Sequence, residues 1–467
     1  MVFTSKAKEV FDVKNITSAG MEAFIAKCSN IYHGRPEWVD LENNVKTINF
    51  AKFIASETAK LSTLGMTIVI EGNSPRVKEL QKQIDEAKSS IRDWVEYAAA
   101  YGTIILKPNG NSIDLVLPGD FIVTDERNGK ISGIVFQNAE VSTDGKLFYT
   151  RLEYHRWIDD VYVITNRCYE GKTRNDLGTM IDIKESPWSN LEEEVGITNL
   201  DAPLFGVMKM PGANSIDAES PLALPIYANA IEELQDLDIA YSRNAKEVWD
   251  SKRTVFLDAD RLVPGKGAYA NTITGRMETA KQMKLPDYVR ILDGTGAGEI
   301  YQEVNPQLNT EMRIKGINAL LSQIGFKCGF SNGYFVFNES TGFTTATQVT
   351  SDQARTIQMI EDVRNMIDTC IIDLVKAINA FEDLYGDTGH IDINDTKSTD
   401  EVDRVIHIHF TPIYTNKEED RQRALQLTNS GYYPKWYYLH MWEGLSEEEA
   451  KALTEEAQPK EQGLFPE

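Results

Sequence analysis

Cysteine and histidine are scarce in this chain. Its 467 residues include four cysteines, none in a C-x-x-C pair, and six histidines. Cysteines so far apart suit neither a disulfide framework nor a zinc site, so we expect reduced thiols. No Ser-His-Asp, Cys-His or Glu-rich metal-binding pattern stands out. We therefore expect a protein that is not an enzyme and that uses no cofactor or metal.

Long apolar runs are also missing. No apolar run reaches the ~18 residues that a transmembrane helix requires. The N-terminal sequence MVFTSKAKEVFDVK lacks the apolar core of a signal peptide. We expect synthesis in a cytoplasm and no membrane partner.

Positive charge is in deficit. The chain has 48 Lys and Arg residues against 71 Asp and Glu residues, a net charge of −23. Proteins that grip DNA through its phosphates are usually basic, which argues against a repressor or a nuclease. A protein past which DNA slides stays compatible, because tight phosphate contacts would cause sticking. The acidity also has a simpler interpretation, which is solubility.

Two glycine motifs resemble nucleotide-binding loops but are incomplete. Gly171-Lys172-Thr173 would end a Walker A loop, yet the required first glycine is Asn166. Gly294–Gly298 resembles a dinucleotide fingerprint, yet its third glycine is replaced by Glu299. Neither motif predicts a phosphate site.

One pair of histidines has a spacing that can hold a metal. His407 and His409 would face the same side of one strand, and Asp403 is the nearest candidate for a third ligand. The alternative, which we favour, is a solvated strand face.

The longest uninterrupted segment is Thr344–Tyr385, which contains no Gly or Pro. It opens with the capping-box pattern Thr345-Ala346-Thr347-Gln348 and closes on Gly386. Its apolar residues recur at steps of three and four, which predicts one long helix of ~60 Å. These residues are Ile357, Ile360, Val363, Ile367, Ile371, Leu374, Val375 and Ile378. Such a rod is typical of a large assembly that spans distance.

Helical and strand patterns alternate along the rest of the chain. Helices are predicted at 18–31, 45–64, 75–101, 222–251, 306–324, 417–428, 435–442 and 446–456. Strands are predicted at 66–71, 103–107, 113–117, 121–124, 131–137, 147–157, 161–168, 205–210, 254–257, 288–292 and 405–410. Residues 103–169 should form an antiparallel meander or small barrel, 176–197 a polar loop, and 458–467 a disordered tail. The class is α+β.

Basic residues gather around the second long helix. Arg243, Lys246, Lys252 and Arg253 crowd its end. They complement the negative end of the helix dipole, which is a sufficient explanation. They would also suit a channel wall that faces passing phosphates. Lys315 and Lys327 lie on the returning helix and just past it.

Several short motifs follow one another in an order typical of one family. Thr344–Val349 opens the long helix, directly after a glycine-rich loop. Leu117–Asp120 lies in the meander, Met210–Asn214 precedes the second long helix, and Gly431–Tyr433 and Gly444–Glu449 come near the end. Over nearly the whole chain this order resembles the portal (head-to-tail connector) proteins of tailed bacteriophages, in the long-tailed, siphophage-like branch. The family usually has T-A-T-E-V at the helix start, where this chain has Gln348.

The resemblance implies the portal fold, mainly α-helical, with long stem and wing helices, a β meander in the wing and a small α/β clip. Its parts would be the wing (1–221), the stem helix (222–251), the clip (252–305), the returning stem helix (306–328), the tunnel loop (329–343), the long wing helix (344–390), and the crown with the C-terminal tail (391–467).

The resemblance also implies a ring, usually of twelve copies, around a channel for packaging and ejecting double-stranded DNA. The tunnel loop would touch the DNA through Ser331, Asn332, Gly333, Tyr334 and Asn338. The only charged residue of this loop is Glu339, so it is no basic clamp.

The partners implied are further copies of the chain, double-stranded DNA, the large terminase subunit at the clip, the major capsid protein at the wing, scaffold during assembly and a head-completion adaptor. The location implied is the portal vertex of the virion, after assembly in the host cytoplasm. One alternative is another ring-forming phage structural protein, such as a minor capsid or tail-ring subunit. A terminase-like motor or nuclease is a third interpretation, which the incomplete phosphate loops disfavour.

Overall fold

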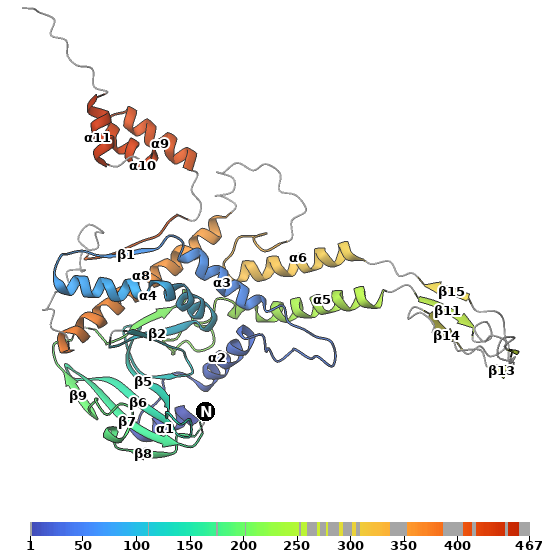
Figure 1. Cartoon of the computed structure of the whole chain (residues 1–467), viewed down its shortest axis with the longest axis horizontal. Coiled ribbons are helices and arrows are strands. Elements are labelled where there is room, and N and C mark those ends of the chain that lie inside the picture. The colour runs from blue at the N-terminus through green and yellow to red at the C-terminus, as the bar shows by residue number, and fades with distance from the viewer. Residues whose placement is uncertain are drawn as a thin grey trace, which may run out of the picture.

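The structure is a computed structural model with a globular body, a projecting arm and a C-terminal group of helices (Figure 1). It describes residues 2–110, 112–173, 176–200, 202–251, 254–258, 269–270, 277–278, 289–292, 301–304, 309–336, 353–385, 405–412, 417–443 and 447–456. Helices and strands are both abundant, which confirms the α+β class.

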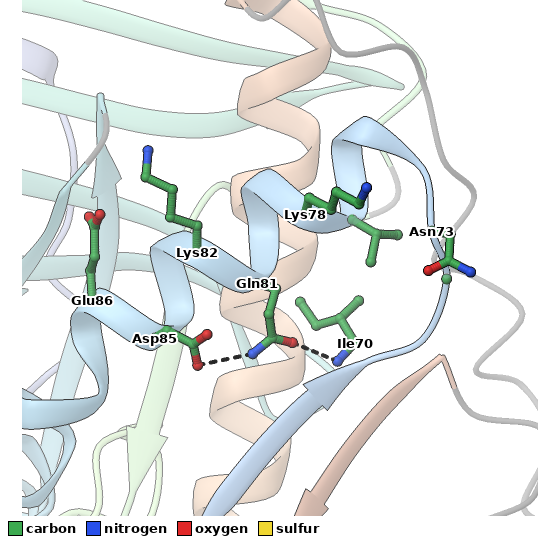
Figure 2. A pocket seen from close by; sticks show the side chains of 9 residues that line it. Ile70, Asn73, Lys78, Gln81, Lys82, Asp85 and Glu86 are labelled. Atoms are coloured by element: carbon green, nitrogen blue, oxygen red, sulfur yellow. Dashed lines mark hydrogen bonds between the residues drawn. The ribbon is translucent and has the colours of Figure 1, made fainter.

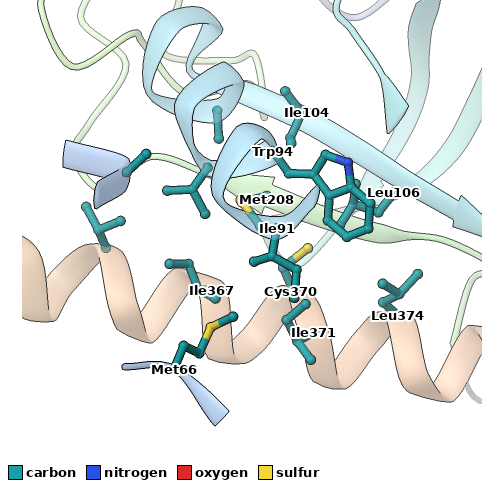
Figure 3. Packing of buried hydrophobic residues seen from close by; sticks show 14 of the residues in the cluster. Met66, Ile91, Trp94, Ile104, Leu106, Met208, Ile367, Cys370, Ile371 and Leu374 are labelled. Atoms are coloured by element: carbon teal, nitrogen blue, oxygen red, sulfur yellow. The ribbon is translucent and has the colours of Figure 1, made fainter. Parts of the chain in front are cut away.

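The centre of the body is the helix α8 (Ala354–Tyr385). The predicted stripe is buried from Ile360 to Ile378, with every member at most 1% exposed. Figure 3 shows Ile367, Cys370, Ile371 and Leu374 of α8 facing Ile91 and Trp94 of α4 (Pro75–Tyr101) and Met208 of β10 (Gly206–Lys209). The described helix is therefore a core element and no free rod, and its 32 residues span ~48 Å. The predicted capping box and Gly386 lie outside the described residues.

Helix α4 begins and ends where the sequence predicts. The Ser74 hydroxyl accepts a hydrogen bond from the Val77 N–H at 3.2 Å, and Pro75 occupies the first turn. Gly102 ends the helix with φ of 84°, in the region that favours glycine. A side chain there would also collide with the carbonyl oxygen of Ala223.

Three N-terminal helices precede α4 in the body. They are α1 (Val2–Phe11), α2 (Ala19–Tyr32) and α3 (Phe50–Ser62). The prediction of a helix from Val45 is wrong by five residues, because Val45 and Asp40 exchange backbone hydrogen bonds of 2.7 and 3.1 Å. Asn49 then adopts a left-handed conformation, with φ of 52°, directly before α3.

The strands expected between residues 103 and 169 are divided between two sheets of the body. The larger sheet is antiparallel, in the order β4 (Phe121–Arg127), β5 (Lys130–Val141), β6 (Phe148–Ile158), β7 (Val161–Gly171) and β8 (Thr179–Ile181). Its sixth strand, β9 (Glu194–Ile197), also pairs with β7. The second sheet has the order β10, β2 (Thr103–Asn109), β3 (Ser112–Val116).

The larger sheet keeps a meander from β4 to β8, and β2 and β3 are separate from it. The described strands form no closed barrel, since β4 pairs only with β5. The expected loop at 176–197 is wrong in part, because β8, β9 and the 3-10 turn η1 (Ile183–Glu185) form there by pairing with or packing on β7.

A small third sheet joins distant parts of the chain. Strand β1 (Thr67–Ile70) pairs antiparallel with β16 (Ile406–His409), as the strand predictions allow. The other edge of β1 is occupied by the Gln81 amide of α4 (Figure 2). Gln81 accepts from the Ile70 N–H at 2.9 Å and donates to the Ile68 carbonyl at 3.0 Å.

The arm consists of α5 (Ile231–Asp250), α6 (Thr310–Lys327) and short strands at its far end. The prediction that the first helix starts at Leu222 is wrong. Pro225 restricts the residue before it to extended backbone, and the Ile226 N–H bonds the Ala99 carbonyl of the body at 3.0 Å. The 3-10 turn η2 (Ala228–Ala230) leads into α5.

Strands β11 (Thr254–Asp258), β14 (Val289–Leu292) and β15 (Tyr301–Val304) form the sheet at the tip of the arm, with β11 in the middle. A second pair is β12 (Tyr269–Ala270) with β13 (Met277–Glu278). The described residues between 252 and 305 hold strands and no helix, so the α/β expectation for this part finds no support there.

The C-terminal helices agree with the sequence to within a residue. They are α9 (Lys417–Asn429), α10 (Lys435–Glu443) and α11 (Glu447–Glu456). Ser446, the predicted cap of the last helix, and the tail 458–467 lie outside the described residues.

Candidate nucleic-acid interface

The two helices of the arm form an antiparallel hairpin. Lys327, at the end of α6, pairs with Glu233, at the start of α5, at 2.5 Å. At the opposite end of the hairpin, Arg313 of α6 pairs with Glu247 of α5. Two ion pairs at opposite ends fix the register of the helices.

The base of the hairpin is embedded in the body. Leu234 and Leu237 of α5 and Leu321 and Ile324 of α6 are at most 3% exposed. They share one core cluster with Ile54 and other residues of α2 and α3. Burial of this size fixes the root of the arm, since each buried aliphatic side chain contributes roughly 1.5–3 kcal/mol.

The outer half of the hairpin keeps apolar side chains in contact with solvent. Tyr241, Val248 and Trp249 of α5 are 43%, 55% and 69% exposed, and Met312 of α6 is 74% exposed. Several large apolar side chains on one thin hairpin are typical of a surface that another protein covers.

Residues 36–48, here called the strap, tie α5 to the body. The Asp238 carboxylate of α5 accepts from the Trp38 indole N–H at 2.8 Å and from the Ile48 backbone N–H at 3.0 Å. Ser242, one turn further along, accepts from the Lys46 N–H at 2.8 Å. Asp238 is 4% exposed, so the strap satisfies a carboxylate that water does not reach.

The predicted tunnel loop is described as far as Val336, and that part folds back onto the body. Ser331 is 3% exposed, and its N–H bonds the Thr356 hydroxyl at 2.8 Å. The Tyr334 hydroxyl donates to Glu57 at 2.7 Å. Phe335 packs edge-on against Phe50, with ring centroids 5.2 Å apart.

The remaining loop candidates differ in their position. Asn332 is exposed and bonds the Ser322 hydroxyl of α6, and Gly333 sits in a left-handed turn with φ of 82°. Asn338 lies outside the described residues. DNA contact by these five residues stays a prediction, and Ser331 and Tyr334 are at present engaged with the body.

The structure separates the basic candidates. Arg243 and Lys246 lie exposed on α5, three residues apart, while Lys252 and Arg253 lie outside the described residues. Lys315 pairs with Glu311 at 2.7 Å, and Lys327 is the partner of Glu233. The described hairpin carries seven acidic and five basic residues, so its charge is mixed.

The histidine pair and the Gly171 motif form no metal or phosphate site among the described residues. His407 and His409 stack with ring centroids 6.1 Å apart, and His407 Nε2 lies 3.1 Å from Glu71. Asp403 is outside the described residues, and no group of three or more potential metal ligands occurs among those that are described. Gly171 ends β7 and leads to another strand, as expected for a turn without a phosphate loop.

Sequence reasoning missed a buried cluster of charges in the body. Lys107 Nζ lies 2.5 Å and Arg151 NH2 3.0 Å from Glu153 Oε2, and His155 Nε2 lies 2.8 Å from Glu153 Oε1. The Tyr162 hydroxyl bonds His155 Nδ1 at 2.8 Å. A signal did exist, because Arg151, Glu153 and His155 alternate along one face of β6.

The chain matches no protein-family model and no curated protein. Among the helices that the structure describes, none combines the length and apolarity needed to cross a bilayer.

Proposed function

We propose that the chain is a phage portal subunit, and that copies of it form a ring at a capsid vertex through which double-stranded DNA is packaged and ejected. The observation that carries the proposal is the antiparallel α5–α6 hairpin, which projects from an α+β body, ends in a small sheet and continues into a loop at its base. This order of parts agrees with the stem, clip and tunnel loop that the sequence resemblance implies.

Two physical features support such a ring. If neighbouring arms pack side by side, the exposed apolar residues of the arm, among them Val248 and Met312, become buried. The mixed charge of the hairpin gives DNA few uncompensated cations to adhere to, because Lys315 and Lys327 are already paired. Energy for movement would then come from a separate terminase motor.

The mass and image of the purified particle test the proposal. We expect a closed ring of about a dozen 52.6 kDa subunits with a hole wide enough for duplex DNA, about 20 Å. A small closed dimer that buries the arms against each other would contradict it. Binding of the large terminase subunit separates a portal from another ring-forming structural protein, and ATPase or nuclease activity would favour a motor.

A further inference from the structure

A cavity of about 850 Å³ opens in the body, away from the arm. Strands β2 and β3 form one wall, and β5, β6 and β7 form another. The loop from Trp188 to Glu192 and the end of α8 at Phe381 and Leu384 complete it. This volume is in the range of small-ligand sites, and the proposed function assigns it no role.

The floor of the cavity carries more positive than negative charge. Lys107 and Arg151 are 5% and 8% exposed, and both contact the single carboxylate of Glu153, which is 7% exposed. Burial lowers the pKa of His155, so the fourth member of the cluster is neutral near pH 7. Two buried cations on one carboxylate leave one charge uncompensated, which a second anion would stabilise.

Two buried polar atoms in the lining lack a partner among the described residues. Arg151 Nε, a donor, and Asn166 Oδ1, an acceptor, form no hydrogen bond. Asn166 is 4% exposed, and its amide nitrogen already donates to the Glu192 carbonyl at 2.8 Å. Buried polar groups are nearly always satisfied, so Arg151 Nε can take one acceptor and Asn166 Oδ1 one donor from a bound molecule.

Acidic residues stand at the rim instead. Asp114 bonds the Asn109 amide at 2.8 Å, and Glu192 pairs with Lys184 at 3.1 Å. Asp120 and Glu140 are exposed. A ligand with several negative charges would be repelled there, whereas one carboxylate can reach the floor. Ile197, Leu204 and Phe381 provide apolar surface beside it.

We propose that this cavity binds an amino-acid-like unit, with one carboxylate on Lys107 and Arg151 and an N–H donor on Asn166. The unit is either a free small molecule or an acidic residue of a partner protein with its backbone N–H. The chemistry is the same in both cases, and it does not depend on the ring.

Matched probes test this site in the full chain. N-acetyl-L-leucine has one carboxylate, one N–H and an apolar side chain, and N-acetyl-L-leucinamide lacks only the carboxylate. We expect calorimetry at constant ionic strength to detect binding of the acid and none of the amide. Arg151→Gln should weaken binding by about tenfold or more, since it removes a charged donor.

Two further variants distinguish the loss of the binding site from a folding defect. Arg151→Lys keeps the charge beside Glu153 but removes Nε, so it should fold and still bind more weakly. Arg127→Gln, on a side chain that is 60% exposed, should bind as the unchanged protein does. Equal binding of acid and amide, or equal affinities of Arg151→Lys and Arg127→Gln, would overturn the proposal.

The source of the carboxylate follows from a second titration. If an acidic residue of a partner protein fills the cavity, the purified chain binds the acid, and the chain in complex with that partner does not. If the natural ligand is free, both bind it. Absence of binding to the purified chain overturns the site in either case.

Discussion

At the scale of the residue, the Glu153 cluster makes stability depend on pH. Burial alone would raise the pKa of Glu153, but Lys107 and Arg151 outweigh burial and hold the pKa well below 4.5. Burial lowers the pKa of His155 below 6.5, despite the neighbouring Glu153. In both cases the unfolded chain binds the proton more readily than the folded chain does.

Acidification should therefore destabilise the protein in two steps. The first begins as the pH falls through 6.5, where His155 is protonated only in the unfolded chain. The second begins below 4.5, where Glu153 behaves in the same way, and its contribution is lost as the pH falls through the folded pKa. Urea unfolding across this range measures both. A His155→Gln variant should lose the first step, and its persistence there would show that other groups cause it.

Substitutions at two glycines measure the cost of backbone strain and the cost of close packing separately. Gly102 and Gly110 both have positive φ, 84° and 59°, but only Gly102 lies against another segment. We expect Gly110→Ala to cost about 1 kcal/mol, for the left-handed conformation alone. Gly102→Ala should cost roughly 3–5 kcal/mol, because its methyl group meets the Ala223 carbonyl. Thermal or urea unfolding compares them, and equal losses would exclude a packing role for Gly102.

Prediction from sequence succeeds for residues whose chemistry is local. Ser74, Pro75 and Gly102 delimit α4 as expected, because a cap depends on neighbours within four residues. Glu153 was missed because β6 is buried on both faces, so alternation did not reveal which side faces the core. Its partner Lys107 lies 46 residues away, on another sheet.

At the scale of the element, the strap decides how α5 is held. Asp238→Ala leaves the Trp38 indole and the Ile48 N–H without their acceptor, which should cost about 2–4 kcal/mol. It should also speed trypsin cleavage at Lys46. Asp236→Ala, an exposed change two residues away on the same helix, should alter stability by no more than about 0.5 kcal/mol. Equal cleavage rates in the two variants would show that the strap does not depend on Asp238.

The helix boundaries that failed share one cause. Residues 222–230 and 45–49 have helical patterns, but backbone groups outside the helix compete for their hydrogen bonds. Ile226 bonds Ala99, and Val45 bonds Asp40 in a tight bridge. Periodicity predicts which face is apolar and does not predict such competition. The place of α8 inside the core also escapes the sequence, since an apolar stripe does not say what covers it.

At the scale of the whole molecule, the exposed apolar residues of the arm predict how copies meet. If arms pack side by side in a ring, Val248→Asp should prevent assembly, because it buries an unpaired charge. Native mass spectrometry and imaging measure the particle. Met180→Asp alters a side chain of similar exposure on β8, 59% against 55%, and should leave assembly unchanged. A normal ring from Val248→Asp would exclude this interface.

The arm also acts as a lever. Its helix α5 ends at Asp250, so the part beyond the strap contact at Asp238 has 12 residues and extends ~18 Å. A tilt of a few degrees at Asp238 therefore displaces the far end by ~1–2 Å, which is comparable to the rise of one residue in a helix. The ion pairs Lys327–Glu233 and Arg313–Glu247 join α6 to α5, so the two helices would tilt together. A movement of the strap would therefore reach the far end of the arm through the buried Asp238 carboxylate.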